Sequence, residues 1–161
     1  MPQKIVILDS IRSAHNVGSI FRTSDAAGVQ KIYLCGPTPD PIDRFGRPQP
    51  EIKKTSLGAS ESVPWEHVGT IENRATEEIL RLIAVLKIEG YTVVAVEQGE
   101  GSTDLYDFQA LEKVAYILGA EVEGVQQELI DAADVTLELP MQGMKESLNV
   151  SVTAGIVLFH K

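Results

Sequence analysis

Asn16 and Arg22 are the first residues of the chain whose types could serve chemistry, and they lie six positions apart in "NVGSIFRTSDAAG". Arg22 stands in a stretch without another charge until Asp25. Its planar guanidinium suits a phosphate, although an arginine there could equally snorkel at the surface. Asn16 could also be only the N-cap of a helix that Gly28 ends. Residue type alone leaves both roles open.

Two further polar groups follow apolar runs in "LGAEVEGV" and "LPMQGMKESLN". The first contains Gly119 and Glu121, and the second contains Ser147 and Asn149. Glycines in such turns let backbone N–H groups approach a ligand closely. Each motif is weak by itself, because Glu121 could simply begin a helix and Ser147 could simply cap one.

The elements that must position these residues alternate between apolar strands and amphipathic helices. Continuous apolar strands that alternate with helices are typical of a parallel sheet covered on both faces. In such sheets ligands bind beyond the carboxyl ends of the strands, where the glycine-bearing segments lie. The patterns predict strands at 4–11, 31–36, 91–98, 113–119 and 135–140, and helices at 16–28, 51–59, 70–90 and 125–133.

A proline-rich loop follows the second predicted strand and is locally basic. "DRFGRPQPEIKK" places Arg44, Arg47, Lys53 and Lys54 around Phe45, which offers charge for phosphates and one aromatic ring for stacking. We expect this loop to bind RNA if the protein acts on RNA. The alternative is a surface loop whose charges are incidental.

The overall charge by itself argues against a nucleic-acid partner, since the formal net charge of the 161 residues is −9. The average hides an asymmetry, because residues 1–54 hold eight Lys and Arg against five acids. The single cysteine, Cys35, provides no disulfide framework, which favours a reducing, cytoplasmic setting. No apolar run is long enough for a membrane span, and we expect no membrane association.

Several common kinds of site lack their sequence signature here. The chain has no P-loop, no G-x-G-x-x-G after the first strand and no G-x-S-x-G elbow. Its three histidines show no metal-ligand spacing, so we expect no metal. NTPase, nicotinamide-enzyme, hydrolase and zinc-enzyme interpretations lose their strongest support.

Taken in order, "NVGSIFRTSDAAG", "LGAEVEG" and "LPMQGMKESLNVSVTAGIVLF" resemble the three motifs of the SpoU (TrmH-like) class. These are RNA ribose 2′-O-methyltransferases of the SPOUT superfamily, and the resemblance covers residues 4–160. It implies an α/β fold: a parallel sheet with helices on both faces and a C-terminal trefoil knot. Residues 1–161 would form one SPOUT methyltransferase domain without added RNA-binding extensions.

The resemblance also implies S-adenosyl-L-methionine as cofactor and a homodimer with the active site at its interface. The family's catalytic residues fall on Arg22, Asn16, Glu121, Ser147 and Asn149. Its cofactor pocket falls on Ala95, Val96, Gly99, Gly119, Leu139, Met141 and Leu148.

Arg22 is a poor free general base, because a guanidinium keeps its proton at every pH near neutral. We expect it to hold the phosphate next to the reacting ribose, while Asn16, Ser147 and Asn149 orient the nucleotide.

The closing segment 144–161 is ambiguous, because its apolar residues fit both a strand and a helix. The resemblance favours a helix that starts near Ser147, with Leu148 on the cofactor and with Val152, Ile156 and Phe159 packed into the knot or the dimer interface.

The substrate is the least determined feature. Among members of this class a tRNA position is the first expectation for a short chain, and rRNA is the second. A catalytically weak or inactive dimeric RNA-binding module of the same fold is the alternative function. A nucleotide-binding domain of another kind is a third possibility, which the third motif disfavours.

Overall fold

A seven-stranded parallel sheet organises the chain, which the computed structural model describes from Met1 to Lys161. The strand order is β3-β2-β1-β6-β4-β7-β5, so the three longest strands lie near the middle. The strands are β1 (Gln3–Asp9), β2 (Val29–Cys35), β3 (Trp65–Val68), β4 (Thr92–Val96), β5 (Thr103–Asp104), β6 (Lys113–Gly119) and β7 (Val135–Glu138).

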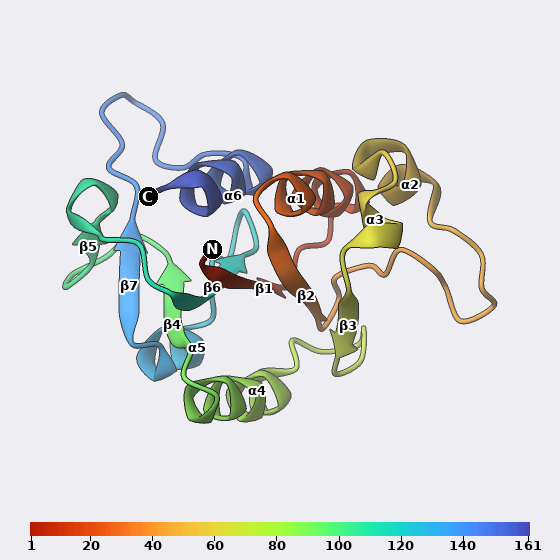
Figure 1. Ribbon diagram of the computed structural model, residues 1–161, viewed down its shortest axis with the longest axis horizontal. Helices are drawn as coiled ribbons and strands as arrows, with labels where there is room; N and C mark the ends of the chain where they lie inside the picture. Colours follow the sequence, from red (N-terminus) through yellow and green to blue (C-terminus); the bar gives the residue numbers. More distant parts are fainter.

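Helices cover both faces of the sheet, as the sequence predicts (Figure 1). One face carries α1, α2, α3 and α6, and the other carries α4 and α5. The parallel α/β fold class is therefore confirmed, while the threading of the C-terminal portion through a loop stays a prediction. The helices are α1 (Ala14–Ala26), α2 (Pro50–Ser56), α3 (Ala59–Ser62), α4 (Thr76–Ile88), the short 3₁₀ helix η1 (Leu105–Asp107), α5 (Gln127–Ala132) and α6 (Val150–Phe159).

The sheet separates two apolar layers, and strand β1 contributes to both. Val6 and Leu8 pack into the layer under α1 and α6, whereas Ile5 and Ile7 pack into the layer over α4. All four side chains are buried, because successive residues of a strand point to opposite faces. Burying each such side chain contributes about 1.5–3 kcal/mol, which explains the continuous apolar run. None of the helices is both long and apolar enough to cross a membrane.

Helix α1 begins at Ala14, and its N-cap is Ser13 rather than Asn16. The Ser13 hydroxyl accepts a hydrogen bond from the backbone N–H of Asn16 at 3.2 Å. The alternative that Asn16 is only the N-cap of the helix is therefore wrong. Since Ser13 satisfies this end of the helix, the Asn16 carboxamide is available for other contacts.

Helix α4 is shorter than predicted, because residues 70–75 lie outside it. Ala75 adopts a left-handed conformation with φ of 54°, which a continuing helix does not accommodate. Ile71, which lies within the predicted helix 70–90, is 67% exposed. Strands β3 and β5 were not predicted; they are four and two residues long.

The closing segment is a helix, but it begins at Val150 and not near Ser147. Asn149 caps α6, because its side-chain oxygen accepts from the backbone N–H of Ser151 at 2.8 Å. Helices α6 and α1 lie side by side (Figure 1), with Ala154 buried and Gly155 next to Thr23 of α1. The small residues on α6 thus permit its close approach to α1.

Candidate active site

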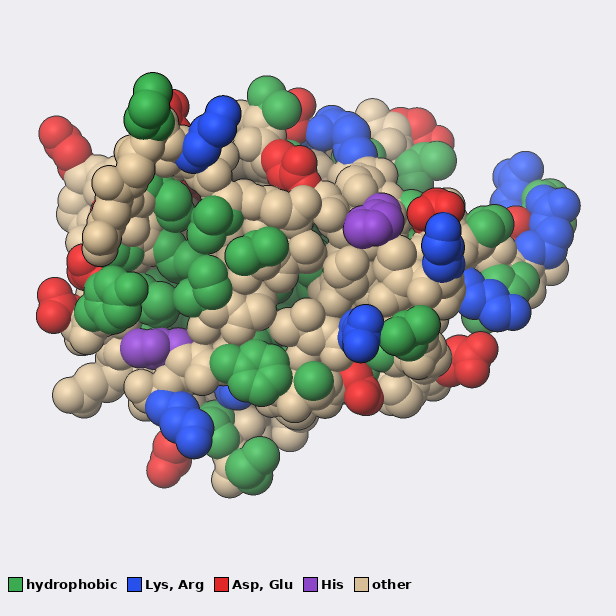
Figure 2. Space-filling view, turned by 90° about the horizontal axis from the view of Figure 1, so that it is seen from above, with side chains coloured by type: hydrophobic (Ala, Val, Ile, Leu, Met, Phe, Trp, Pro, Cys, Tyr) green, Lys and Arg blue, Asp and Glu red, His purple; other side chains and the backbone are tan.

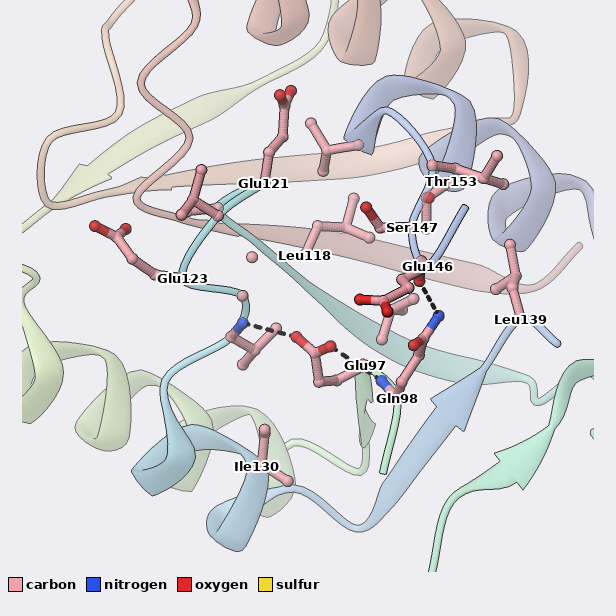
Figure 3. Close-up of a pocket in the computed structure, with 18 of the residues that line it drawn as sticks. Glu97, Gln98, Leu118, Glu121, Glu123, Ile130, Leu139, Glu146, Ser147 and Thr153 are labelled. Carbon is pink, nitrogen blue, oxygen red and sulfur yellow. Dashed lines mark hydrogen bonds between the residues drawn. The ribbon is translucent and has the colours of Figure 1, made fainter. Parts of the chain in front are cut away.

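A cavity of about 520 Å³ lies at the carboxyl ends of β4, β6 and β7 (Figure 3). Its walls come from the ends of these strands, from the loop after β6, from the segment before α6 and from Thr153 of α6. This is the edge of the sheet at which parallel α/β folds bind ligands. The volume lies within the range of about 300–1,000 Å³ that is usual for small-molecule sites.

Five of the seven residues predicted for the cofactor line this cavity. Two do not: Ala95 points into the apolar layer over α4, and Gly99 is not part of the wall. Strand alternation explains Ala95, because its neighbour Val96 faces the cavity side of the sheet. The five that line the cavity are Val96, Gly119, Leu139, Met141 and Leu148.

The loop after β6 folds back sharply and forms one wall of the cavity. A Cβ atom on Gly119 would overlap the backbone nitrogen of Val125, so the return of the chain requires glycine here. The N–H of Gly124 donates to the carbonyl of Ala120 at 2.7 Å, and Gly124 has a φ of 70°. The tight turn between these residues presents Glu121 at the rim.

Three of the predicted catalytic residues, one from each motif, meet at this rim. The Asn16 carboxamide donates to a carboxylate oxygen of Glu121, and that of Asn149 donates to the Asn16 side-chain oxygen at 3.3 Å. Asn16 is 6% exposed, whereas Glu121 and Asn149 are exposed. Ser147, the fourth, lines the cavity nearby (Figure 3). We call Asn16, Glu121 and Asn149 the rim cluster.

Arg22, the fifth predicted catalytic residue, does not join the rim cluster. It is exposed and borders a shallow hollow between α1 and the α2–α3 region, together with Asp25, Leu57 and Ser62. Six residues turn a helix through about 600°, which places Arg22 about 240° around α1 from Asn16. Within this chain the side chains of Asn16 and Arg22 therefore lie on different surfaces.

The cavity wall is acidic. Its 21 residues include Glu97, Glu121, Glu123 and Glu146, and they include no Lys, Arg or His. On the outside, Arg12 contacts the Glu123 carboxylate at 2.8 Å, and this hydrogen bond holds the pKa of Glu123 below its ordinary value. Such a wall favours a ligand with positive charge.

With this geometry in place, residues 3–159 match the sequence model of the SpoU rRNA Methylase family. The chain belongs to that family. The match covers all three motifs, so the resemblance read from them is confirmed. The cavity and the rim cluster are accordingly features of a SpoU family chain.

The relatives that are named for an activity are longer than this chain, which spans little more than half of the first of them. It is 34% identical over 155 residues to the 23S rRNA (guanosine-2′-O-)-methyltransferase RlmB of Escherichia coli K12, which covers 96% of this chain and 58% of RlmB. The AdoMet-bound rRNA methyltransferase from Sinorhizobium meliloti superposes with a TM-score of 0.81 at 30% identity, over 98% of this chain and 55% of that one. The TrmH/SpoU tRNA modifying enzyme of A. aeolicus gives 0.78 at 27%, over 99% and 74%.

The predicted RNA-binding residues of this SpoU family chain lie on and after a loop that projects from one end of the molecule (Figures 1 and 2). The guanidinium groups of Arg44 and Arg47 lie 4.8 and 4.9 Å from the ring centre of Phe45, which is 66% exposed. Lys53 and Lys54 are exposed on α2. The structure thus brings Arg44 and Arg47 together with the ring of Phe45, while Lys53 and Lys54 lie on the helix that follows.

Asp43 organises the tip of this loop. Its carboxylate accepts from the backbone N–H groups of Phe45 and Arg47 at 2.8 and 2.9 Å, and from the Arg47 guanidinium at 3.0 Å. A backbone bridge between Ile42 and Pro48 closes the base. We call residues 42–48 the arginine hairpin.

Glu97 is a cavity residue that the sequence-based prediction missed. It directly follows β4, in the glycine-bearing segment "VEQGEGS", but nothing in the sequence signals its own role. No group of three or more His, Cys, Asp or Glu side chains is arranged to hold a metal ion.

Proposed function

We propose that this chain is an S-adenosyl-L-methionine-dependent RNA methyltransferase that methylates a ribose 2′-hydroxyl. The observation that carries the proposal is the meeting of Asn16, Glu121 and Asn149, one from each motif, at the rim of the cavity. Relatives named as 2′-O-methyltransferases support the reaction, and the AdoMet-bound relative supports the cofactor. The same names disfavour the alternative of an RNA-binding module without turnover.

We propose rRNA as the substrate class, which reverses the order expected from the sequence. RlmB and the Sinorhizobium meliloti relative are both named for rRNA, and both share about a third of their residues with this chain in the matched region. The tRNA modifying enzyme of A. aeolicus is less similar, at 27% identity. A tRNA substrate is therefore the second candidate.

The cavity fits the proposed cofactor in size and charge. S-adenosylmethionine carries a sulfonium cation, and the acidic wall around Glu97 and Glu146 complements it. Leu139, Met141 and Leu148 offer apolar contact for the adenine ring. When bound, the cofactor supplies an electrophilic methyl group.

The chain's own residues would align the ribose and the phosphate next to it. In the transfer the 2′-oxygen forms a bond to the methyl carbon, the carbon–sulfur bond breaks, and the hydroxyl proton leaves. Asn16 and Asn149 would hold the nucleotide by neutral hydrogen bonds, with Glu121 fixing their orientation. Arg22 would hold the adjacent phosphate as a fork, and a phosphate oxygen could take up the proton.

We further propose that Arg22 reaches the rim cluster from a second copy of the chain. A homodimer is supported by the exposed apolar face of α6, where Val152, Ile156 and Phe159 are 50%, 38% and 56% exposed. Leu148, 40% exposed, continues this face toward the cavity, and Figure 2 shows hydrophobic side chains gathered on that side of the molecule. Of the two predicted locations for Val152, Ile156 and Phe159, the knot and the dimer interface, their exposure in the single chain supports the dimer interface.

Variants of Arg22 test the reaction. We expect Arg22→Ala and Arg22→Lys to lower methyl transfer by about 100-fold or more, since a lost positioning contact costs that much. Cofactor affinity, measured by calorimetry, should not change. Transfer of labelled methyl to rRNA and to tRNA is measured in parallel. Wild-type rates in both variants would contradict the assignment, and incorporation into tRNA alone would reverse the substrate order.

Mixed dimers test the second copy. Arg22→Ala and Asn16→Ala chains should each be inactive alone, yet activity should return when they are mixed. In a mixed dimer one site then holds both an intact Arg22 and an intact Asn16. Ile156→Glu should make the protein monomeric in sedimentation, while Val85→Glu, an exposed apolar residue on α4, is the control. Failure to recover activity in confirmed mixed dimers would place Arg22 and Asn16 in the same protomer's site.

A further inference from the structure

Three charged side chains outside the rim cluster hold three consecutive backbone positions of the cavity loop, residues 124–126. Arg74 donates to the carbonyl of Gly124 at 3.1 Å. Glu97 accepts from the N–H of Val125 at 3.0 Å, a contact drawn in Figure 3. Asp9 accepts from the N–H of Gln126 at 2.9 Å. These side chains come from the ends of β1 and β4 and from the turn before α4, so three distant segments meet on one short loop.

Asp9 is the most heavily bonded of the three, and its side chain is fully buried. Besides the backbone of Gln126 it accepts from the Gln126 carboxamide at 3.0 Å, from the Ser10 hydroxyl at 3.0 Å and from Arg74 at 3.1 Å. In the sheet it stands opposite Gly119, where the cavity loop begins. A buried ion pair seldom contributes net stability compared with apolar packing, so its role here is better sought in the arrangement that it imposes.

The surroundings of Arg74 are strained in a way that this network explains. Ser10 and Ala75 both adopt positive φ, 60° and 54°. Arg74 connects these two positions, because it directly precedes Ala75 and its guanidinium donates to the Ser10 hydroxyl at 3.0 Å. Such conformations persist only where neighbouring contacts over-determine them. Gly124 is constrained by the same network, because a Cβ there would overlap the Glu97 carboxylate.

We propose that Asp9, Arg74 and Glu97 are positioning residues for the methyl transfer, acting through Glu121. Glu121 is exposed and lies at the tip of a turn, from which the chain returns through residues 124–126. Within the chain its carboxylate accepts a hydrogen bond from Asn16. Fixing those three positions fixes where the carboxylate meets the rim cluster. The inference rests on the proposed function, because it assumes that the rim cluster acts on the ribose.

The first test measures the loop itself and requires no activity. Arg74→Lys keeps the charge but loses the planar fork that reaches Asp9, Ser10 and the loop carbonyl together. We expect hydrogen exchange in the peptide covering residues 124–126 to become about tenfold faster, as for a lost hydrogen bond to a charged group. Arg81→Lys on the exposed side of α4 is the matched control. Unchanged exchange in both Arg74→Lys and Glu97→Gln would overturn the proposal.

The second test asks whether the three residues act through Glu121. We expect Arg74→Lys to lower kcat about tenfold while KM for S-adenosylmethionine changes by less than about threefold. In a Glu121→Ala background the same change should have almost no further effect. An equal loss of kcat in both backgrounds would mean a general structural role and would overturn the proposal. If wild-type protein transfers no methyl group at all, the proposed function fails, and the exchange experiment still decides whether the loop is clamped.

Discussion

The cavity and the arginine hairpin lie at the same edge of the sheet but carry opposite charge. The cavity follows β4, β6 and β7, on one side of β1, and its wall holds four carboxylates and no basic side chain. The hairpin follows β2, on the other side of β1, and presents Arg44 and Arg47 around an exposed ring. The net charge of −9 therefore hides a contrast between two surfaces of opposite charge.

The difference indicates how one edge can serve both a cation and a polyanion. Carboxylates that attract a sulfonium also repel phosphates, so under the proposed function the RNA would be held by cationic groups placed away from the cavity. The ribose would then reach the rim cluster from that side. This division predicts that changes in one region alter one affinity and leave the other intact.

Gly119→Ala should have the largest effect and should break only the cavity side. Its added Cβ overlaps backbone atoms of the returning loop, which cannot move aside as a flexible side chain can. We expect S-adenosylmethionine affinity to fall about 10- to 100-fold, since forced backbone shifts cost about 1–3 kcal/mol. Calorimetry measures this fall, and RNA binding by filter assay should be unchanged. Gly143→Ala is the control, because an added Cβ there meets no atom within 4 Å. Equal loss of both affinities would contradict the division.

Reversing the charges of Arg44 and Arg47 to Glu should break only the hairpin side. We expect RNA affinity to fall about tenfold, and the slope of log affinity against log salt to decrease by about 2 if each arginine contacts one phosphate. Cofactor affinity is the internal comparison. Arg81→Glu, an exposed arginine on α4, controls for the change of net charge in each single variant. Unaltered RNA binding would make the hairpin charges incidental.

The two regions also differ in how far the sequence predicts them. The central strands carry continuous apolar runs because both of their faces are buried, and that pattern predicted β1, β4 and β6 correctly. The glycine at position 119 pointed to the cavity loop, but for a different reason: the sequence predicted a close approach to a ligand, and the structure shows a close approach to the backbone of the returning loop. For the arginine hairpin the sequence shows only that arginines and Phe45 are close in the chain; the packing of both guanidinium groups on the ring could not be predicted.

Other features could not be predicted because they depend on contacts between distant segments. By residue type Asn16 could cap the helix, but in the structure Ser13 has that role. Nothing in the local sequence signals that Glu97 accepts the N–H of Val125, or that Ala75 turns left-handed beneath Arg74. The separation of Arg22 from Asn16, in contrast, follows from helix geometry alone.

The charge of the cavity can be probed with the cofactor and its demethylated product. S-adenosylhomocysteine lacks the sulfonium cation, so the acidic wall should favour the cofactor over the product. Glu146→Gln should shrink this preference by about twofold, the modest effect of a single exposed charge. Calorimetry at low salt measures both ligands. Glu100→Gln, outside the cavity wall, should leave the ratio alone. A preference that does not respond to Glu146 or to salt would mean that the ligands are distinguished by shape.

The smallest expected effect concerns the pH dependence of the arginine hairpin. The N–H of Arg47, followed by that of Phe45, lowers the pKa of Asp43 below its ordinary 3.8. Because the folded pKa is depressed, the contribution of this carboxylate to the hairpin is complete above about pH 4 and is lost as pH falls through the folded value. NMR shifts of the Phe45 amide should therefore titrate below pH 4, while RNA affinity at neutral pH should drop slightly in Asp43→Ala. Glu51→Ala, on the neighbouring helix α2, is the control. A Phe45 amide that does not change below pH 4 would show that the hairpin keeps its form without the carboxylate, and the ring would then owe its exposure to the two arginines alone.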